Sequence, residues 1–293
     1  MKNSRIILIT LLTLIFLFGV NSLSVIASNI ILDQYDREVR IVENPTRIVS
    51  IAPSNTALLI ELGLGERIVG VTNWCFFEEV EDVTRVGDID PLNLELIVSL
   101  NPDLIVAHRL NGKEVVDRLT EFGFNVLAFN PNNLEALIES VEILGKVAGV
   151  EEKAAELVSE MRAKLKRAKE DGGKNKEKGL KVFYLMFDGE PLWTAGPGSF
   201  IHETIELAGG INIAGDQPFE WVQIDLEAIY EANPDIIIYG GDPEEIYNSK
   251  RWSPLAAAKK SQVYQLDMSV FEVATPAMFD EILKLVELLA GSK

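Results

Sequence analysis

The sequence has few of the residues from which metal sites and disulfides are built. Its 293 residues include one cysteine, Cys75, and two histidines, His108 and His202. A single cysteine excludes an intrachain disulfide, so an exported chain must be held together by its core. Two histidines without a cluster at metal-ligand spacing exclude a bare zinc or manganese site of the several-histidine kind. We therefore expect no intrinsic metal ion or cofactor.

Motifs for phosphate binding and nucleophilic catalysis are also missing. The chain has no Walker A motif, and Gly63 and Gly65 lack the third glycine of a dinucleotide fingerprint. No Ser/His/Asp order stands out, and Cys75 has no evident base to activate it. The sequence therefore favours a binding protein over an enzyme.

Basic residues are scarce relative to acidic ones. The chain has 27 Lys and Arg against 45 Asp and Glu, a formal net charge of −18. A field of that sign repels nucleic acid and anionic lipid and favours basic partner surfaces. We expect no nucleic-acid partner.

The N-terminus has the pattern of a secretory signal. Lys2 and Arg5 precede an uncharged apolar run over residues 6–20, and residues 25–28 (VIAS) supply small side chains for cleavage. This predicts a cleavable signal peptide over residues 1–28 and export to the periplasm. An uncleaved anchor is the alternative, because the run lies near the lower length limit for a membrane span. With no cysteine near position 28, we expect no lipoprotein anchor.

Short apolar strands alternate with helices through most of the chain. After a hairpin over residues 31–42, strands are expected at 48–51, 68–71, 104–107 and 126–129, which indicates a parallel sheet covered on both faces. The first helix of this lobe is expected at 57–62, with Asn55 or Thr56 as its cap.

A long helix separates two such regions. Apolar residues recur every three or four positions from Ala154 to Ala168, which predicts an amphipathic helix over 151–171. The charged, glycine-rich residues 172–179 are expected to end it as a loop, and strands resume at 181–185. The predicted organisation is an N-terminal lobe at 29–150, a connecting helix at 151–171 and a C-terminal lobe at 172–293.

The two lobes share a repeated segment. Residues 94–97 (LELI) and 101–106 (NPDLIV) recur with the same internal spacing as 226–229 (LEAI) and 233–238 (NPDIII). In each copy a helix stops before the proline and a strand follows the aspartate. The chain is therefore expected to hold two similar α/β lobes that face each other across a cleft.

These segments, in order, resemble a known family. With residues 45–50 (PTRIVS), 86–87 (VG) and 209–212 (GGIN), they are similar to the helical-backbone class of ABC-importer solute-binding proteins, which serve cobalamin, ferric siderophores and haem. The resemblance covers nearly the whole mature chain. It implies two Rossmann-like α/β lobes, each with a central parallel sheet, joined by one long rigid helix. Residues 53–56 (PSNT) and 92–95 (LNLE) are most similar to cobalamin-binding members.

The resemblance implies a site of aromatic side chains that stack on a macrocycle. Packing in the core or between the lobes is the alternative for each of them. The positions that match are Trp74, Phe187, Trp193, Trp221 and Phe271.

Histidine and cysteine near the expected cleft have several possible roles. His108 is expected to donate to a corrin amide or to ligate cobalt or haem iron, with a surface histidine as the alternative. Cys75 lines the pocket or is merely buried, and His202 is expected to be structural.

The chain departs from the family pattern at several positions. Ile89 and His108 stand where the family has tryptophan, and Val273 where it has arginine. The missing arginine weakens a ferric-siderophore assignment, although Arg109 and Arg85 remain as possible cations at the rim.

The family also docks onto a membrane permease through one exposed glutamate on each lobe. The matching residues are Glu95 and Glu227, which occupy the same position in the two copies of the repeat. Two symmetric carboxylates suit a two-fold permease with arginines. The alternative is that each glutamate only complements the dipole of its helix.

Together these features predict a monomeric periplasmic binding protein of an ABC importer for a metal chelate. Cobalamin or another corrinoid is the first candidate ligand, and a ferric siderophore or haem is the alternative. An enzyme or a ligand sensor on the same scaffold would need, respectively, convergent titratable groups in the cleft or a different membrane partner.

Overall fold

The computed structural model describes residues 30–40, 44–267, 270–271 and 274–292. The predicted signal peptide at 1–28 and the departure at Val273 lie outside these residues. No helix within the described ranges is long and apolar enough to cross a membrane.

The N-terminal lobe is a parallel sheet between helices, as predicted. A short antiparallel hairpin, β1 (Ile30–Leu32) and β2 (Glu38–Arg40), precedes it. The sheet has the order β5-β4-β3-β6-β7, and all its pairs are parallel. Its strands are β3 (Ile48–Ser50), β4 (Ile68–Val71), β5 (Thr84–Arg85), β6 (Leu104–His108) and β7 (Val126–Phe129). The helices of this lobe are α2 (Pro53–Glu61), α3 (Leu94–Ser99), α4 (Lys113–Glu121) and α5 (Leu134–Ala148).

The C-terminal lobe repeats this plan with a smaller sheet. Its four strands have the order β10-β8-β12-β13 and are also parallel. They are β8 (Lys181–Leu185), β10 (Ile211–Asn212), β12 (Ile236–Tyr239) and β13 (Val263–Gln265). A separate antiparallel pair, β9 (Trp193–Ala195) and β11 (Trp221–Gln223), was not foreseen from the sequence. The helices are α7 (Phe200–Leu207), α8 (Leu226–Ala232), α9 (Pro243–Tyr247), α10 (Ala256–Lys259) and α12 (Met278–Gly291).

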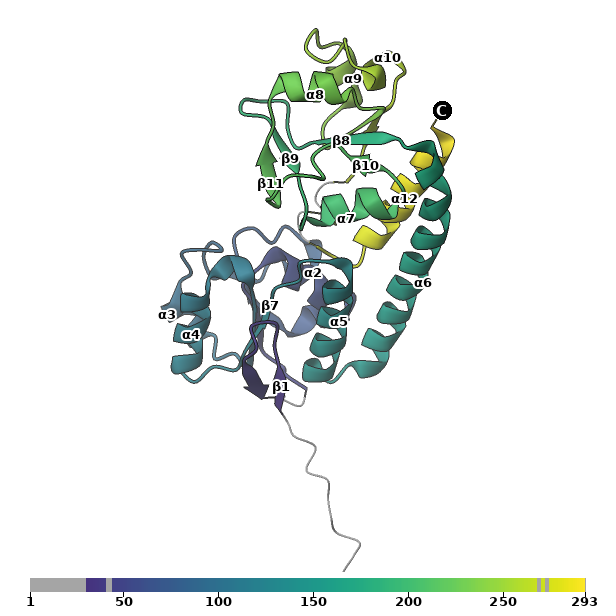
Figure 1. The fold of residues 1–293 in the computed structure, drawn as a ribbon. Coiled ribbons are helices and arrows are strands. Elements are labelled where there is room, and N and C mark those ends of the chain that lie inside the picture. Colours follow the sequence, from purple (N-terminus) through teal and green to yellow (C-terminus); the bar gives the residue numbers. More distant parts are fainter. Residues whose placement is uncertain (1–29, 41–43, 268–269, 272–273, 293) are drawn as a thin grey trace, which may run out of the picture.

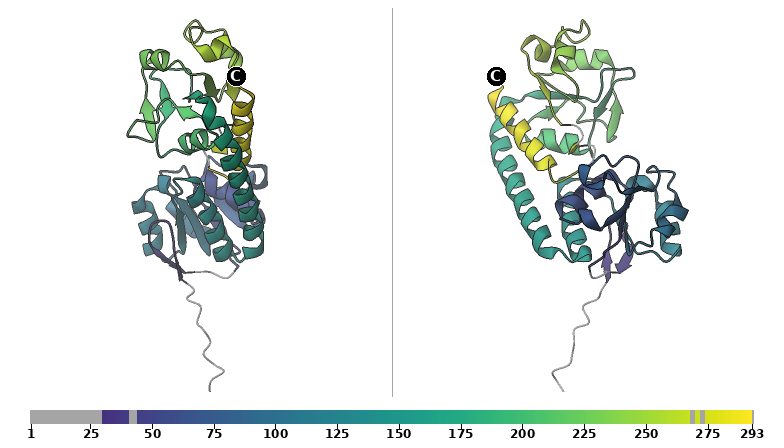
Figure 2. Two further views of the ribbon diagram at one scale, coloured as in Figure 1. Left: turned by 45° about the vertical axis from the view of Figure 1, so that its right-hand side comes forward. Right: turned by 180° about the vertical axis from the view of Figure 1, so that it is seen from behind.

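Helix α6 (Glu151–Asn175) runs along one side of both lobes (Figures 1 and 2), with α12 packed beside it. Its predicted apolar stripe, from Ala154 to Ala168, is buried except at Leu157, which is partly buried. The expected loop at 172–179 is wrong at its start, because α6 continues through Gly172 to Asn175. Gly172 lies so close to the Leu207 carbonyl that any Cβ would overlap it. This glycine therefore permits close helix packing and does not end the helix.

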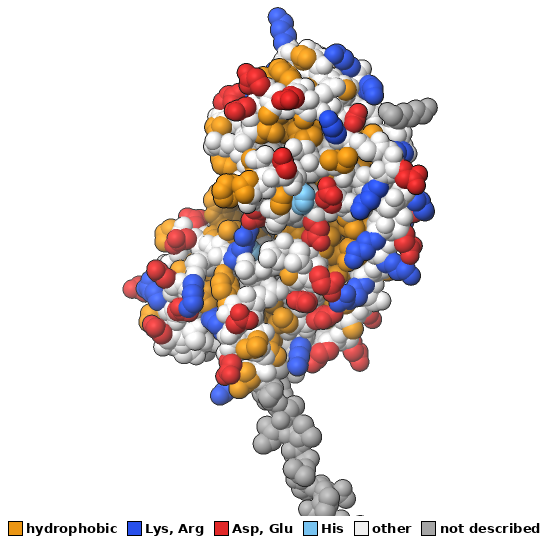
Figure 3. Space-filling model, viewed as in Figure 1, with side chains coloured by type: hydrophobic (Ala, Val, Ile, Leu, Met, Phe, Trp, Pro, Cys, Tyr) orange, Lys and Arg blue, Asp and Glu red, His pale blue; other side chains and the backbone are white. Residues whose placement is uncertain are grey.

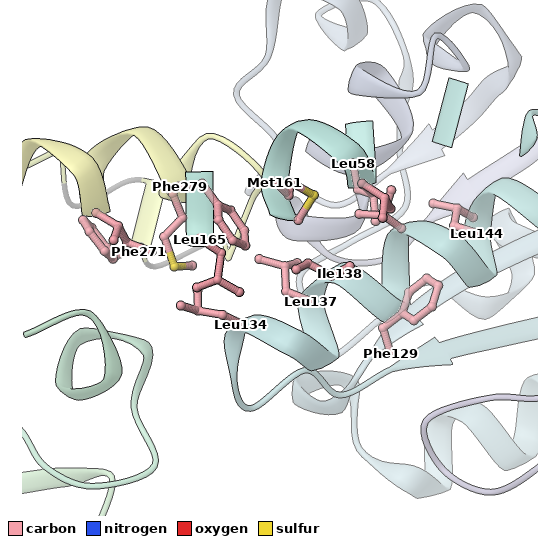
Figure 4. Packing of buried hydrophobic residues seen from close by; sticks show 14 of the residues in the cluster. Leu58, Phe129, Leu134, Leu137, Ile138, Leu144, Met161, Leu165, Phe271 and Phe279 are labelled. Carbon is pink, nitrogen blue, oxygen red and sulfur yellow. The ribbon is translucent and has the colours of Figure 1, made fainter. Parts of the chain in front are cut away.

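One apolar core crosses from lobe to lobe beside α6. Leu134, Leu137 and Ile138 of α5 belong to the same cluster as Leu165 of α6 and Phe279 of α12 (Figure 4). A polar bond crosses at the same level: the Glu203 carboxylate on α7 accepts a hydrogen bond from the Leu134 N–H, 2.9 Å away, at the start of α5. Burial raises the pKa of Glu203, and the bond from Leu134 opposes that rise. The side that holds α6 and α12 is called the spine below.

The repeated Asn-Pro-Asp segment turns the chain in the same way in both lobes. Asn101 and Asn233, at the ends of α3 and α8, have φ angles of 47° and 44°. Asparagine tolerates this left-handed conformation better than most residues. The proline that follows cannot continue a helix, so each copy passes from helix to strand at the equivalent residue.

The aspartate of the segment then fixes the new strand beside the first strand of its lobe. The Asp103 N–H donates to the Arg47 carbonyl and its Oδ1 accepts from the Arg47 N–H, both at 3.0 Å. Asp235 makes the same two bonds with Lys181, at 2.9 and 3.0 Å. The side chain of Arg47 donates to the Leu100 carbonyl at the end of α3, and that of Lys181 donates to the Ala232 carbonyl at the end of α8. These matching bonds confirm the internal duplication.

The expected cap of α2 is wrong. The helix begins at Pro53, with Ala52 as its N-cap and no side-chain cap. Thr56 instead donates from its hydroxyl to Ser50 Oγ at 2.8 Å, inside the core. Proline suits the first helical position because its missing N–H would be unpaired there in any case, so the helix starts earlier than Asn55.

Candidate functional site

A cavity of about 300 Å³ lies between the two lobes. Hydrophobic side chains gather along the boundary between the lobes, where the surface is hollowed (Figure 3). Much of the wall comes from residues that follow the carboxyl ends of parallel strands: Ala52 to Ser54 after β3, Arg109 after β6, Pro131 after β7 and Met186 after β8. Ligands of open α/β sheets bind at this edge, so the duplicated topology alone places a site here.

The two walls differ in chemistry. The N-lobe wall is lined by Ala52, Pro53, Ser54, Ile89, His108, Arg109, Leu110 and Pro131. The C-lobe wall is more apolar and is lined by Met186, Phe200, Ile201, Glu220, Trp221, Phe271 and Ala274. The first wall supplies hydroxyl, imidazole and guanidinium donors, and the second supplies aromatic and aliphatic faces. A ligand with a flat apolar body and a polar edge matches this division.

His108 ends β6 and is held by a tight local turn. Its Nδ1 accepts a hydrogen bond from the Leu110 N–H at 3.3 Å, and the backbone N–H of His108 donates to Asn111 Oδ1 at 2.8 Å. The buried Asn111 amide donates in turn to the Ile51 carbonyl at 2.8 Å and to the Ile89 carbonyl at 3.1 Å. The imidazole is thereby positioned at the cavity wall.

Its protonation state follows from these contacts. Burial, reinforced by the positive charge of Arg109, lowers the pKa of His108 to about 4. The ring is therefore neutral at pH 7, and because Nδ1 is an acceptor we assign the proton to Nε2. A ring that ligates metal through Nε2 usually carries its proton on Nδ1 and donates it to a neighbour. The arrangement thus favours donation to a ligand carbonyl over metal ligation.

An ion pair crosses the cleft between the lobes. Arg109 Nη2 lies 3.0 Å from Glu220 Oε1 and 3.3 Å from Oε2. Both side chains are about one-third exposed. The other proposed rim cation, Arg85, is not available, because its guanidinium donates to the backbone carbonyls of Thr72, Cys75 and Val80 inside the N-terminal lobe.

Two of the five predicted aromatic residues line the cavity. Trp221, on β11, is 38% exposed, and its ring centroid lies 6.5 Å from that of Tyr184. Phe271 is almost fully buried at the base of the wall. The structure does not bring the other three predicted residues into the lining. These are Trp74 and Phe187, which are exposed, and the partly exposed Trp193 on β9.

The remaining sequence candidates lie elsewhere. Cys75 is fully buried, with Sγ 3.2 Å from Thr56 Oγ1, and does not line the cavity. His202 lies on α7, 3.1 Å from the Asn212 amide, away from the cavity. Asn212 also donates to the Ala195 carbonyl at 2.8 Å, which explains the asparagine of the GGIN segment.

The two glutamates of the repeat are both exposed. Glu95 lies in the first turn of α3 and Glu227 in the first turn of α8. Neither forms a salt bridge with another residue in the described ranges. Within the same ranges, no three His, Cys, Asp or Glu side chains come together as a metal site.

Several lining residues were missed from the sequence. Met186 directly follows a predicted strand, and the carboxyl-end rule was sufficient to find it. Phe200 and Glu220 carry no comparable signal, because their approach to the cavity depends on how the second lobe faces the first.

Comparison with known proteins agrees with this architecture. The family model described as "Periplasmic binding protein" matches residues 48–270. The chain belongs to this family. A relative named an uncharacterized ABC transporter substrate-binding lipoprotein, YvrC of Bacillus subtilis, is 33% identical over 87% of this chain and 83% of its own length. The vitamin B12-binding protein of Salmonella paratyphi A is 30% identical over 78% of this binding protein and 85% of its own length.

Solved structures share the two-lobed fold. The periplasmic vitamin B12-binding protein of Vibrio cholerae superposes with a TM-score of 0.75 at 24% identity, over 85% of this binding protein and 98% of that chain. The periplasmic haem-binding protein of Roseiflexus gives a TM-score of 0.71 at 21% identity, over 84% and 98%. The binding protein is the substrate-binding component of an ABC importer, and a small-molecule ligand and a membrane permease are its partners.

Proposed function

We propose that the protein is exported to the periplasm, captures cobalamin or another corrinoid between its lobes and delivers it to its permease. The observation that carries this is the divided cavity at the carboxyl edges of both sheets, with Trp221 and Phe271 on one wall and His108 and Ser54 on the other. A corrinoid has a flat apolar ring with amide groups around its edge, which matches aromatic faces opposed to hydrogen-bond donors. The vitamin B12-binding relatives support the same choice.

The size of the cavity sets a requirement for this ligand. About 300 Å³ is at the lower end of small-molecule pockets. A corrinoid therefore needs the lobes to separate at the cleft while α6 keeps them joined.

Calorimetric titration of the mature protein tests the ligand. Cobalamin, haem and a ferric catecholate are each titrated under the same conditions, and we expect heat and a saturating isotherm with cobalamin. Heat with haem or the iron chelate and none with cobalamin would replace the corrinoid with the alternative ligand. Binding of none of the three would refute a metal-chelate binder.

The exposed glutamates are proposed as the docking points for the permease. Charge-assisted bonds from arginine to two symmetric carboxylates would align both lobes on a two-fold partner. Glu95→Ala combined with Glu227→Ala should abolish uptake of labelled cobalamin and leave its affinity unchanged. The matched control is Glu121→Ala with Glu231→Ala, also one exposed glutamate on each lobe. Equal loss of uptake in both double variants would reject these docking points.

Export and the monomeric state complete the proposal. A cleavable signal predicts that the mature chain begins near residue 29, which N-terminal sequencing of the periplasmic protein would measure. Light scattering on the purified protein should give the mass of one chain.

A further inference from the structure

The ion pair between Arg109 and Glu220 differs from the other ion pairs that link distant elements. Arg162, Lys164 and Arg167 on α6 pair with residues of α5 or α12 on the spine, and Arg251 pairs with Asp188 and Glu190 within the C-terminal lobe. Arg109 and Glu220 instead face each other from the two walls of the cavity. Among the described lining residues, Arg109 is the single cation and Glu220 the single carboxylate.

The ion pair leaves most of the N–H donors of Arg109 without a hydrogen bond to the described residues. A guanidinium has five N–H donors arranged as a fork that matches a carboxylate or phosphate. Here only Nη2 contacts Glu220, and it contacts both carboxylate oxygens. Nε and Nη1 make no hydrogen bond to the described residues. Each two-nitrogen edge of a guanidinium includes Nη2, so an anion that meets two nitrogens at once must take the place of Glu220 on Nη2.

Breaking this ion pair also costs little free energy. Exposed ion pairs contribute little to stability because water and salt screen them. Because no other Lys or Arg is among the described lining residues, Arg109 is the cation that an anionic ligand meets in the cavity.

We propose that Glu220 occupies the place of an anionic group of the ligand, and that binding exchanges the Glu220 carboxylate on Arg109 for that group. This rests on the proposed function and narrows it: the ligand carries a phosphodiester or carboxylate beside its macrocycle. In the ligand-free protein the ion pair holds the cleft mouth closed. In the complex the ligand's anion satisfies Arg109, and Glu220 turns to solvent.

Paired ligands that differ in the anionic group provide the first test. Cobalamin has a phosphodiester that cobinamide lacks, and haem has two carboxylates that its dimethyl ester lacks. Arg109→Gln should weaken binding of the anionic member by about tenfold or more, the usual scale for a charge-assisted bond. It should weaken binding of the member that lacks the anionic group by about twofold or less. Glu220→Gln should strengthen the anionic member by about threefold to tenfold, because the internal competitor is removed.

The control variants make the same charge changes on the spine. Arg167 and Glu287 form an exposed ion pair between α6 and α12, and Arg167→Gln and Glu287→Gln should change each affinity by about twofold or less. Equal losses for the two members of a pair in Arg109→Gln would overturn the exchange. So would an unchanged or weaker affinity in Glu220→Gln.

A ligand-free measurement separates this inference from the identity of the ligand. Spin labels at Glu114→Cys on α4 and Lys250→Cys in the C-terminal lobe report the distance between the lobes, and the buried Cys75 remains unlabelled. Glu220→Gln should lengthen or broaden that distance distribution, and Glu287→Gln should not. If no ligand of the panel binds, the proposed function fails, yet this result still decides whether the pair closes the cleft. An unchanged distribution in Glu220→Gln would overturn the inference.

Discussion

The lobes contact each other in two regions of opposite construction. On the spine, α5, α6 and α12 share one apolar cluster, and Glu203 adds a hydrogen bond between lobes. At the cleft mouth, a partly exposed ion pair joins Arg109 to Glu220. Close-packed apolar contacts resist displacement, whereas screened ion pairs exchange readily. One edge therefore fixes the orientation of the lobes, while the other can open by small movements.

The largest expected effect comes from breaking the spine. Leu165→Ala removes a buried side chain of α6 from the shared cluster, which should lower the free energy of unfolding by about 2–4 kcal/mol. Because the cluster belongs to both lobes, urea unfolding should remain a single transition. Leu157→Ala, at a partly buried position of the same helix, should cost less than half as much. Two separate transitions would show that the lobes do not share a core.

A substitution at the cavity should spare stability and reduce binding. Trp221→Ala removes an aromatic face from the C-lobe wall, and we expect an affinity loss of about 10- to 100-fold for cobalamin, as for a contact residue of this size. Trp74→Ala, which removes an exposed tryptophan outside the lining, should change affinity by about twofold or less. Calorimetry measures both. A larger loss for Trp74 would place the binding surface outside this cavity.

The protein should become less stable as pH rises, because Glu61 is partly buried beside Lys164 and Asp280 of the spine. Burial raises the pKa of Glu61 on α2 to about 7, which Lys164 opposes and Asp280 reinforces. The folded protein therefore binds this proton more tightly than the unfolded chain, and stability falls as pH increases from about 4.5 through 7. Glu61→Gln should remove this dependence and stabilise the protein at pH 8 by about 1 kcal/mol, a value reduced for partial exposure. Denaturation midpoints at pH 5 and pH 8 provide the measurement.

The cleft should be insensitive to pH over the same range. The pKa of His108 is lowered to about 4 by burial and by Arg109, so the imidazole stays neutral between pH 8 and 5.5. Affinity for cobalamin should then vary by about twofold or less across that range. A drop centred near pH 6.5 would mean that the imidazole titrates normally. In the unfolded chain His108 titrates near its ordinary pKa of about 6.5. His108 therefore makes the free energy of unfolding fall as pH drops from about 6.5 to 4, which is opposite in sign to the effect of Glu61.

The sequence predicted the architecture better than the site. The Asn-Pro-Asp repeat specified two matching lobes because its turn and its aspartate bonds are local and nearly identical in both copies. The stripe of α6 was visible for the same reason, since helical spacing is local. The end of α6 was misjudged because Gly172 serves packing against Leu207, a contact distant in sequence.

The aromatic residues show which part of the site the sequence patterns could not predict. Trp221 and Trp193 lie on the paired strands β11 and β9, yet only Trp221 lines the cavity. The register pairs Trp221 with Ala195 and Trp193 with Gln223, so the two side chains share a face but lie at opposite ends of the strand pair. Which end reaches the cavity depends on how the pair sits in its lobe and on the lobe orientation set by the spine. Neither is encoded in short motifs, so the aromatic composition suggested a stacking site without selecting its members.

The bond from Leu134 to Glu203 has a consequence for any attempt to divide the protein. Residues 30–150 alone would lose the bond from Leu134 at the start of α5 and expose the apolar side chains of that helix to water. The separate C-terminal half would lose this bond and expose the apolar side chains that pack against α5. Although the two halves of the duplication share one plan, each is stabilised by the other. We expect neither half to fold on its own.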